Sequence, residues 1–135
     1  MRKEASTENL TYRELYNEGN SALSMALEEE REAQLDARLL LEHVCGTSLQ
    51  TLLLDGKRPV TDNEAELYRR LLKRRCSREP LAYILGKWDF MGLEFGVSSD
   101  VLIPEQDTEN LVEEVMREVC DGDRILDLCT GSGCI

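Results

Sequence analysis

The sequence has little of what usually marks a metal site, a membrane span or a repeat. Its 135 residues hold one histidine, His43, and five cysteines with no C-x-x-C pair, so a metal site is not expected. No apolar run approaches the roughly 18 residues of a membrane span, so no membrane contact is expected. Internal repeats and low-complexity tracts are also missing. An odd cysteine count and a start without an apolar leader, over residues 1–6, indicate a reducing cytoplasm.

Positive charge is also scarce. The chain has 16 basic and 27 acidic residues and a net charge of -11, which argues against direct binding to nucleic acid. Its basic residues gather in one place: Arg69, Arg70, Lys73, Arg74, Arg75 and Arg78. We interpret this cluster as a solvated helix face, because no aromatic residues are interleaved for base stacking. Docking of an acidic partner or of RNA phosphate is the alternative.

What the chain does have is a series of helix signals in residues 10–78. Thr11 with Glu14, and Thr61 with Glu64, form capping boxes, so helices should begin after both threonines. Apolar residues follow each box at helical spacing. Together with the two helices between them, these segments predict a helical bundle, which we assign to residues 1–78.

The two inner helices have weaker signals. One is expected from about Ala33, with Gly46 as its left-handed stop. A short one should begin after Ser48 as N-cap and end at Gly56, again as a left-handed residue.

After residue 78 the apolar period changes. Aromatic and aliphatic residues are dense on both sides of Met91-Gly92, which predicts a β-hairpin over residues 87–97. Val101–Ile103 should be a second extended piece, because Pro104 disfavours helix in the residue before it. We interpret residues 79–104 as a linker between two bodies.

The final segment, residues 105–135, predicts the opening of an α/β domain. Thr108 should cap an amphipathic helix, with a turn following at residues 121–123. A buried strand, Ile125–Leu128, should then run into a glycine-rich loop. The apolar positions expected to be buried on the helix are Leu111, Val112, Val115, Met116 and Val119. The predicted fold class is therefore α+β overall: a helical bundle, a hairpin linker and the truncated start of a Rossmann-like sheet.

The glycine loop allows two cofactor interpretations. Gly131-x-Gly133 fits the first two glycines of a dinucleotide fingerprint, which would indicate an NAD-dependent oxidoreductase. An S-adenosylmethionine site, in contrast, has an acid at the strand end, and Asp127 occupies that position. A carboxylate suits an amine-bearing ligand better than a pyrophosphate, which it would repel. A tight turn without any ligand is the third possibility.

Four blocks in order carry a resemblance to a known family. They are Glu79–Gly86, Phe90–Phe95, Val101–Pro104 and Ile125–Ile135. In sequence and spacing they are similar to HemK-type peptide chain release factor glutamine N5-methyltransferases. The helical bundle is the least diagnostic part of this resemblance.

The resemblance implies a bundle that recognises substrate, a hairpin linker and a seven-stranded domain that binds S-adenosylmethionine. The implied partner is a peptide chain release factor, whose Gly-Gly-Gln glutamine is methylated, and the implied protein is a cytoplasmic monomer. The implied cofactor-binding residues are Asp127, Cys129, Thr130, Gly131, Ser132 and Gly133.

Two positions depart from the family's pattern. Glu105 stands where the family commonly has arginine, so an anion contact or ion pair made there is lost or reversed. Cys129 stands where glycine is common, which is tolerable if the backbone keeps φ negative.

The family's Asn-Pro-Pro-Tyr motif, which holds the substrate amide, is not found in these residues, so none of them is expected to be catalytic. We therefore expect an N-terminal fragment that is inactive alone, with residues 121–135 poorly anchored. A ribosomal-protein glutamine methyltransferase and a non-enzymatic module that binds release factors are the alternatives. A DNA adenine methyltransferase is disfavoured by the net charge.

Overall fold

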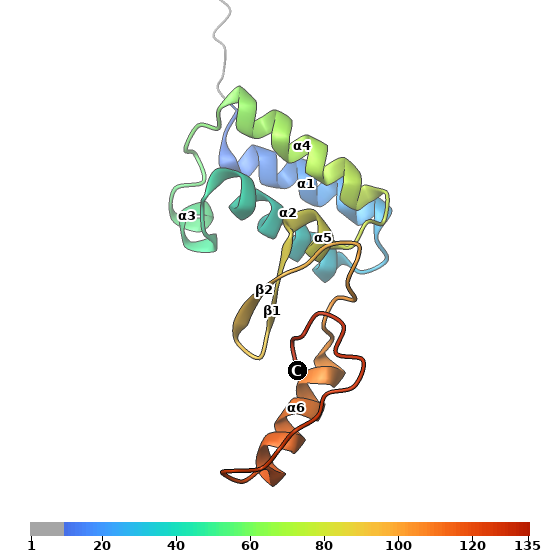
Figure 1. The fold of residues 1–135 in the computed structure, drawn as a ribbon. Helices are drawn as coiled ribbons and strands as arrows, with labels where there is room; N and C mark the ends of the chain where they lie inside the picture. The colour runs from blue at the N-terminus through green and yellow to red at the C-terminus, as the bar shows by residue number, and fades with distance from the viewer. Residues whose placement is uncertain (1–9) are drawn as a thin grey trace, which may run out of the picture. The chain divides into compact units, whose positions relative to one another are not determined.

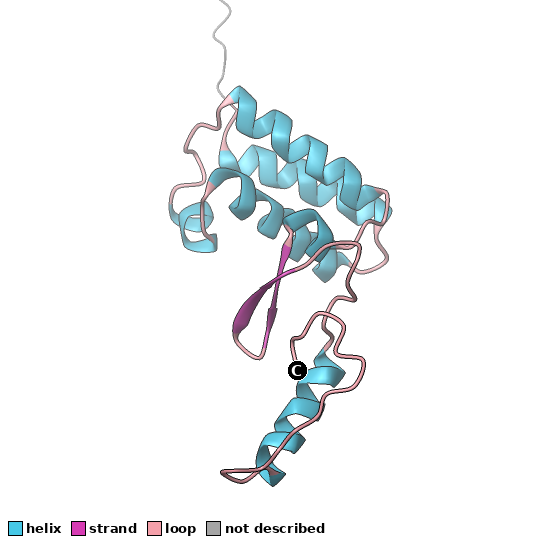
Figure 2. Ribbon diagram, viewed as in Figure 1, coloured by secondary structure: helices cyan, strands magenta, loops and turns pink. Residues whose placement is uncertain are grey.

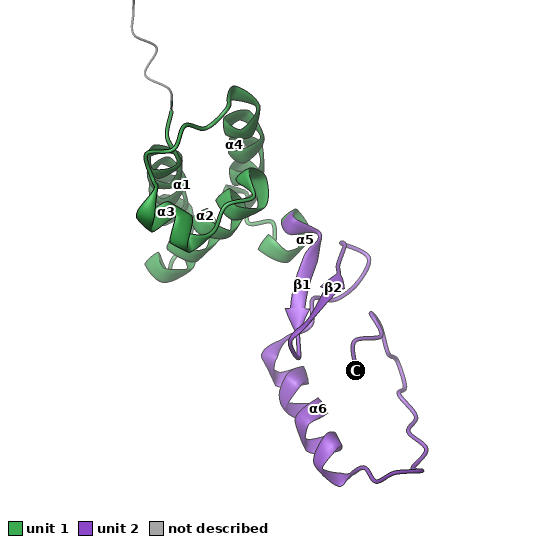
Figure 3. Ribbon diagram, turned by 90° about the vertical axis from the view of Figure 1, so that its left-hand side faces the viewer, with its two compact units in different colours: residues 1–84 green, residues 85–135 purple. Residues whose placement is uncertain are grey.

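The computed structural model describes residues 10–135, and the leader interpretation of residues 1–6 lies outside them. The chain divides into two compact units, residues 1–84 and 85–135 (Figure 3). The first unit contains α1 (Tyr12–Ala26), α2 (Glu30–Cys45), α3 (Leu49–Leu54), α4 (Asp62–Cys76) and most of α5 (Leu81–Leu85). The second contains β1 (Lys87–Phe90), β2 (Leu93–Gly96) and α6 (Gln106–Glu118).

Side-chain caps fix where the helices of the first unit begin. The Thr11 amide donates to Glu14 Oε2 at 2.9 Å, and the Glu14 amide donates back to Thr11 Oγ1 at 3.4 Å. Thr61 and Glu64 form the same reciprocal pair at 2.8 and 3.3 Å. Both predicted capping boxes are confirmed, and each satisfies two amides that the helix itself leaves without partners.

Two predicted boundaries of the inner helices are wrong. Helix α2 begins at Glu30 rather than near Ala33, because acidic residues are favourable in the first turn of a helix. Gly56 is not a left-handed stop, since it has no positive φ and α3 is capped by Asp55. Gly56 is needed for space, because a Cβ there would lie 2.6 Å from the Leu52 carbonyl oxygen.

The remaining inner caps are confirmed. Gly46 ends α2 in the left-handed region at φ 57°. Ser48 begins α3 by accepting a 3.2 Å hydrogen bond from the Thr51 amide.

The core of the first unit lies between α1, α2 and α4, which pack on one another (Figure 1). Its fully buried large side chains are Leu15, Leu23, Leu40, Leu41 and Tyr68. The Tyr68 hydroxyl donates to the Ala37 carbonyl at 3.1 Å, so its polar atom is satisfied inside the core. The predicted bundle is therefore present.

The predicted hairpin is also present in the second unit. Strands β1 and β2 pair antiparallel, with Phe90 opposite Leu93 and the two residues Met91 and Gly92 between them. Both turn residues have positive φ, 52° and 74°, which matches the right-handed twist of the flanking strands. The predicted extended piece at residues 101–103 is irregular rather than a strand.

Helix α6 differs from its prediction in its N-cap residue and in the exposure of its apolar face. Its N-cap is Glu105, and the Thr108 amide already donates to the Glu105 carbonyl at 3.0 Å, so Thr108 lies inside the helix. None of the five expected apolar positions is buried, and Met116 is 68% exposed. The physical reason is that no element in residues 10–135 covers this face.

The predicted strand at residues 125–128 is not formed, and the chain after Glu118 has no regular structure (Figure 2). A strand needs a neighbour for its amides and carbonyls, and the described residues supply none. The predicted turn at residues 121–123 is present, with Gly122 at φ 91°. The fold is thus helical with one two-stranded antiparallel sheet, which confirms the α+β class. The start of a seven-stranded sheet stays a prediction.

Candidate functional site

The glycine loop, residues 127–133, is an exposed and sharply turning segment. Its backbone enters the left-handed region at every second residue, at Cys129 (φ 63°), Gly131 (φ 58°) and Gly133 (φ 76°). The Gly133 amide donates to the Thr130 carbonyl at 3.0 Å, which closes one turn. The loop therefore has the conformation that the two glycines indicate in the sequence.

Open space surrounds both glycines. A Cβ on Gly133 would meet no atom within 4 Å, and on Gly131 the nearest would be the Cys129 carbonyl oxygen at 3.9 Å. Glycine is therefore used here for backbone conformation, and the space beside the loop is free for a ligand.

Cys129 is the one residue of the glycine loop other than glycine that has a positive φ. The condition under which the thiol is tolerable, a negative φ, is not met, since φ is 63°. The left-handed backbone conformation costs a residue with a Cβ atom roughly 1–2 kcal/mol. This position is also the one where the resemblance places glycine, so the backbone keeps the glycine conformation although the side chain is a thiol.

The residues of the loop fit S-adenosylmethionine in chemistry. Asp127 is exposed, so its carboxylate can accept hydrogen bonds from an amine or from ribose hydroxyls. The hydroxyls of Thr130 and Ser132 are the other polar side-chain groups of the segment. All six predicted residues lie in this one segment.

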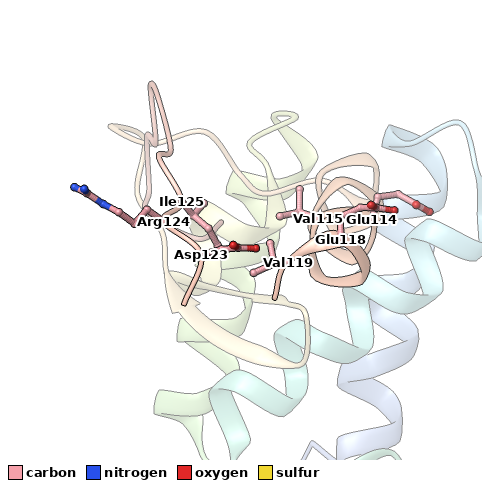
Figure 4. Close-up of a pocket in the computed structure, with 7 residues that line it drawn as sticks. All are labelled: Glu114, Val115, Glu118, Val119, Asp123, Arg124 and Ile125. Carbon is pink, nitrogen blue, oxygen red and sulfur yellow. The ribbon is translucent and has the colours of Figure 1, made fainter. Parts of the chain in front are cut away.

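A separate open cavity of about 480 Å³ lies between the end of α6 and residues 123–125 (Figure 4). Val115, Val119 and Ile125 form its apolar part, while Arg124 points away from it (Figure 4). The acidic residues around it are Glu114, Glu118 and Asp123. It includes no residue of the glycine loop. Sequence reasoning missed it, because the apolar residues that line it had been assigned to a closed core.

Arg75 is not part of a solvated face, contrary to the interpretation from sequence. Its side chain is 10% exposed, and its Nε donates to Asp36 Oδ2 at 2.6 Å. Its Nη2 donates to Glu32 Oε1, also at 2.6 Å. Burial raises the pKa of Asp36, and the hydrogen bond from Arg75 opposes that shift. This cluster joins α4 to α2, so Arg75 is structural.

Two other cations of the basic cluster form ion pairs shorter than 3 Å within the protein. Arg69 donates two hydrogen bonds of 2.7 Å to the Glu18 carboxylate, which lowers the pKa of Glu18. Arg74 Nε donates to Glu79 Oε2 at 2.8 Å. Much of the positive charge is therefore neutralised at short range, which weakens the docking alternative.

Neither a metal site nor a membrane span emerges from residues 10–135. No three side chains of the metal-ligating types converge there, and no helix is long and apolar enough to cross a bilayer.

Comparison with known proteins identifies the first unit. A family model described as the PrmC N-terminal domain matches residues 14–86.

Three curated relatives are each named release factor glutamine methyltransferase. The relative from Geobacter sulfurreducens is 42% identical over 103 residues, which are 76% of this chain and 36% of the relative. That from Bordetella pertussis is 44% identical over 104 residues, 76% of this chain and 38% of the relative. The relative from Rhodospirillum rubrum is 47% identical over 102 residues, which are 74% of this chain and 31% of the relative. The chain thus spans about a third of the length of these relatives.

Proposed function

The chain belongs to the PrmC N-terminal domain family, and from that premise we propose that the protein containing it is a release factor glutamine N5-methyltransferase. The reaction would transfer a methyl group from S-adenosylmethionine to the side-chain amide of the glutamine in a Gly-Gly-Gln loop. The observation that carries the proposal is the similarity of three quarters of the chain to relatives of that name. The reaction would take place in the cytoplasm, where release factors act.

We assign the proposed roles by segment. Residues 1–78 would recognise the release factor, and residues 79–104 would link this bundle to the methyltransferase domain, which begins at residue 105. The compact capped bundle and the separate hairpin-containing unit support this division of labour.

We propose that the glycine loop holds the cofactor. Asp127 would accept hydrogen bonds from it, while the left-handed turns at Gly131 and Gly133 would let the backbone approach closely. The remaining contacts would come from Cys129, Thr130 and Ser132. When bound, S-adenosylmethionine supplies an electrophilic methyl group on a sulfonium centre. The chain's own contribution is to orient it.

The remaining chemistry would come from further residues of the full-length protein. An amide nitrogen is a weak nucleophile, so it must be held in line with the methyl group by hydrogen-bond acceptors. The exposed apolar residues of α6 and of residues 125–128 support a longer domain, since an α/β sheet would cover them. We accordingly propose that residues 1–135 alone give no turnover.

The test is methyl transfer by the full-length protein from radiolabelled S-adenosylmethionine. Purified release factor and purified ribosomal proteins are offered in separate reactions, and a release factor with its Gly-Gly-Gln glutamine changed to alanine is the control. Label in intact release factor alone supports the proposal. Label in ribosomal protein alone overturns the choice of substrate, and binding to release factor without any label overturns the enzymatic function.

A further inference from the structure

The hairpin tip contains an unusual residue for its conformation. Met91 is the first of two turn residues and has φ 52°, a region that favours Gly, Asn or Asp. An unbranched apolar side chain cannot form the local hydrogen bonds that let Asn and Asp adopt this conformation. This conformation costs roughly 1–2 kcal/mol, which a contact outside the turn can offset.

That contact comes from α6. The Met91 amide donates a 2.7 Å hydrogen bond to Glu109 Oε1, across 18 residues of sequence. The amide of a first turn residue is not used by the strand ladder, so it is free to bind elsewhere. A carboxylate acceptor makes the bond charge-assisted, and such bonds are shorter and stronger than neutral ones. Glu109 lies in the first turn of α6, so the bond fixes the tip near the start of that helix.

Helix α6 is the only regular element between the hairpin and the glycine loop in the described residues. Because an α-helix is stiff, a shift of the first turn of α6 also moves the residues that follow its last turn. Glu113, one helical turn further along, pairs with Arg117 at 3.6 Å, and within residues 10–135 no hydrogen bond or ion pair joins its carboxylate to the hairpin. Of the two acidic residues, only Glu109 forms a hydrogen bond with the hairpin.

We propose that Glu109 is a positioning residue: its carboxylate holds the hairpin tip against α6 and so sets where α6 presents the glycine loop. In the full-length protein it would align the loop with the part of the chain that binds substrate. This last step rests on the function proposed above, whereas the hairpin contact does not.

The first experiment examines the contact itself by NMR of the 135-residue chain. In Glu109→Ala the Met91 amide proton should move upfield and exchange with solvent about tenfold faster, as expected for loss of a bond to a charged group. Glu109→Gln should restore part of the shift, because its side-chain oxygen can still accept. Glu113→Ala is the matched control and should leave Met91 unchanged. An unaltered Met91 amide in Glu109→Ala overturns the proposal.

The second experiment uses the full-length protein and separates binding from turnover. Glu109→Ala should lower kcat for release factor by roughly tenfold or more, since small misplacements of reacting groups are costly. The dissociation constants for S-adenosylmethionine and release factor should stay unchanged, and Glu113→Ala should behave as wild type. A normal kcat in Glu109→Ala overturns the positioning role. If wild type methylates no release factor, the proposed function fails, while the NMR result still decides the contact.

Discussion

Gly19 of α1 lies directly against the hydroxyl of Tyr68 in α4, so closely that a Cβ on residue 19 would be 1.8 Å from that oxygen. The same hydroxyl donates to the Ala37 carbonyl of α2. One side chain therefore touches all three long helices of the bundle. A glycine in the middle of a helix lowers helix propensity, and its presence here is explained by the space that Tyr68 needs.

Gly19→Ala should destabilise the bundle by about 1–3 kcal/mol or more, because the new methyl group displaces Tyr68 from its place. Urea unfolding followed by circular dichroism measures this change. Ser24→Ala, at an exposed position of the same helix, is the control and should stay within about 0.5 kcal/mol of wild type.

Tyr68→Phe should cost about 1 kcal/mol through the lost hydrogen bond to Ala37. In that background Gly19→Ala should cost less than in wild type, since the nearest atom is gone. Strict additivity of the two changes in urea unfolding would contradict the account of Gly19.

Asp36→Ala should cost about 3–5 kcal/mol, because it leaves Arg75 buried with only Glu32 as a charged partner. Glu18→Ala removes an ion pair to Arg69 of similar length, 2.7 Å, but one at the surface, and should cost about 0–1 kcal/mol. If urea unfolding showed similar decreases in unfolding free energy for the two variants, burial of the Arg75–Asp36 pair would not explain its contribution to stability.

The capping-box carboxyls predict a loss of stability in acid. Hydrogen bonds from Thr11 and Thr61 lower the pKa values of Glu14 and Glu64 in the folded chain. Their stabilisation is therefore present above the pKa of the unfolded chain and is lost as pH falls through the lower pKa of the folded chain. Replacing both with glutamine, which still suits a capping box, should reduce this pH dependence of the unfolding free energy.

The control for the acid prediction is Glu66→Gln. Glu66 is an exposed residue of α4, two positions after Glu64. If Glu66→Gln flattens the pH profile as much as the double capping variant does, the caps are not the source of the effect.

The helical bundle could be predicted from sequence because its signals are local. Thr11, Ser48 and Thr61 each cap a helix within three residues of themselves, and that chemistry depends on no distant partner. Arg75 was misjudged for the opposite reason. Its place next to Asp36 depends on how α4 packs on α2, across 39 residues of sequence.

The apolar residues of the second unit show another limit of sequence reasoning. The spacing of Leu111, Val115 and Val119 correctly predicts a helix with one apolar face, but not what covers that face. Ile125–Leu128 likewise has strand composition but no neighbour to pair with in residues 10–135. For the site, the glycines predicted a turning loop, whereas the left-handed Cys129 became apparent only in the structure.

Residues 121–135 should exchange their amide hydrogens quickly in the monomeric 135-residue chain. Only two of their amides, those of Asp123 and Gly133, donate backbone hydrogen bonds in the structure. The amides of α1 and α4, which lie in the packed bundle, are the internal reference. Strong protection of residues 125–128 would contradict the irregular structure of this segment.

Cys129→Gly should leave the affinity of the full-length protein for S-adenosylmethionine within about twofold of wild type, because the left-handed φ of 63° belongs to the loop itself and its strain is relieved equally in the free and bound states. Cys134→Gly is the control, since the backbone at Cys134 has no positive φ. Calorimetric titration measures both. An affinity of Cys129→Gly raised about fivefold or more over wild type would contradict this account of the loop, because it would show that the strain arises only on binding.

The most direct test of the central claim is mass spectrometry of release factor after incubation with the full-length protein and S-adenosylmethionine. We predict a mass increase of one methylene unit, located by fragmentation on the side-chain amide of the Gly-Gly-Gln glutamine. An unmodified glutamine, with the methyl group found on ribosomal protein or on no protein, would contradict the claim.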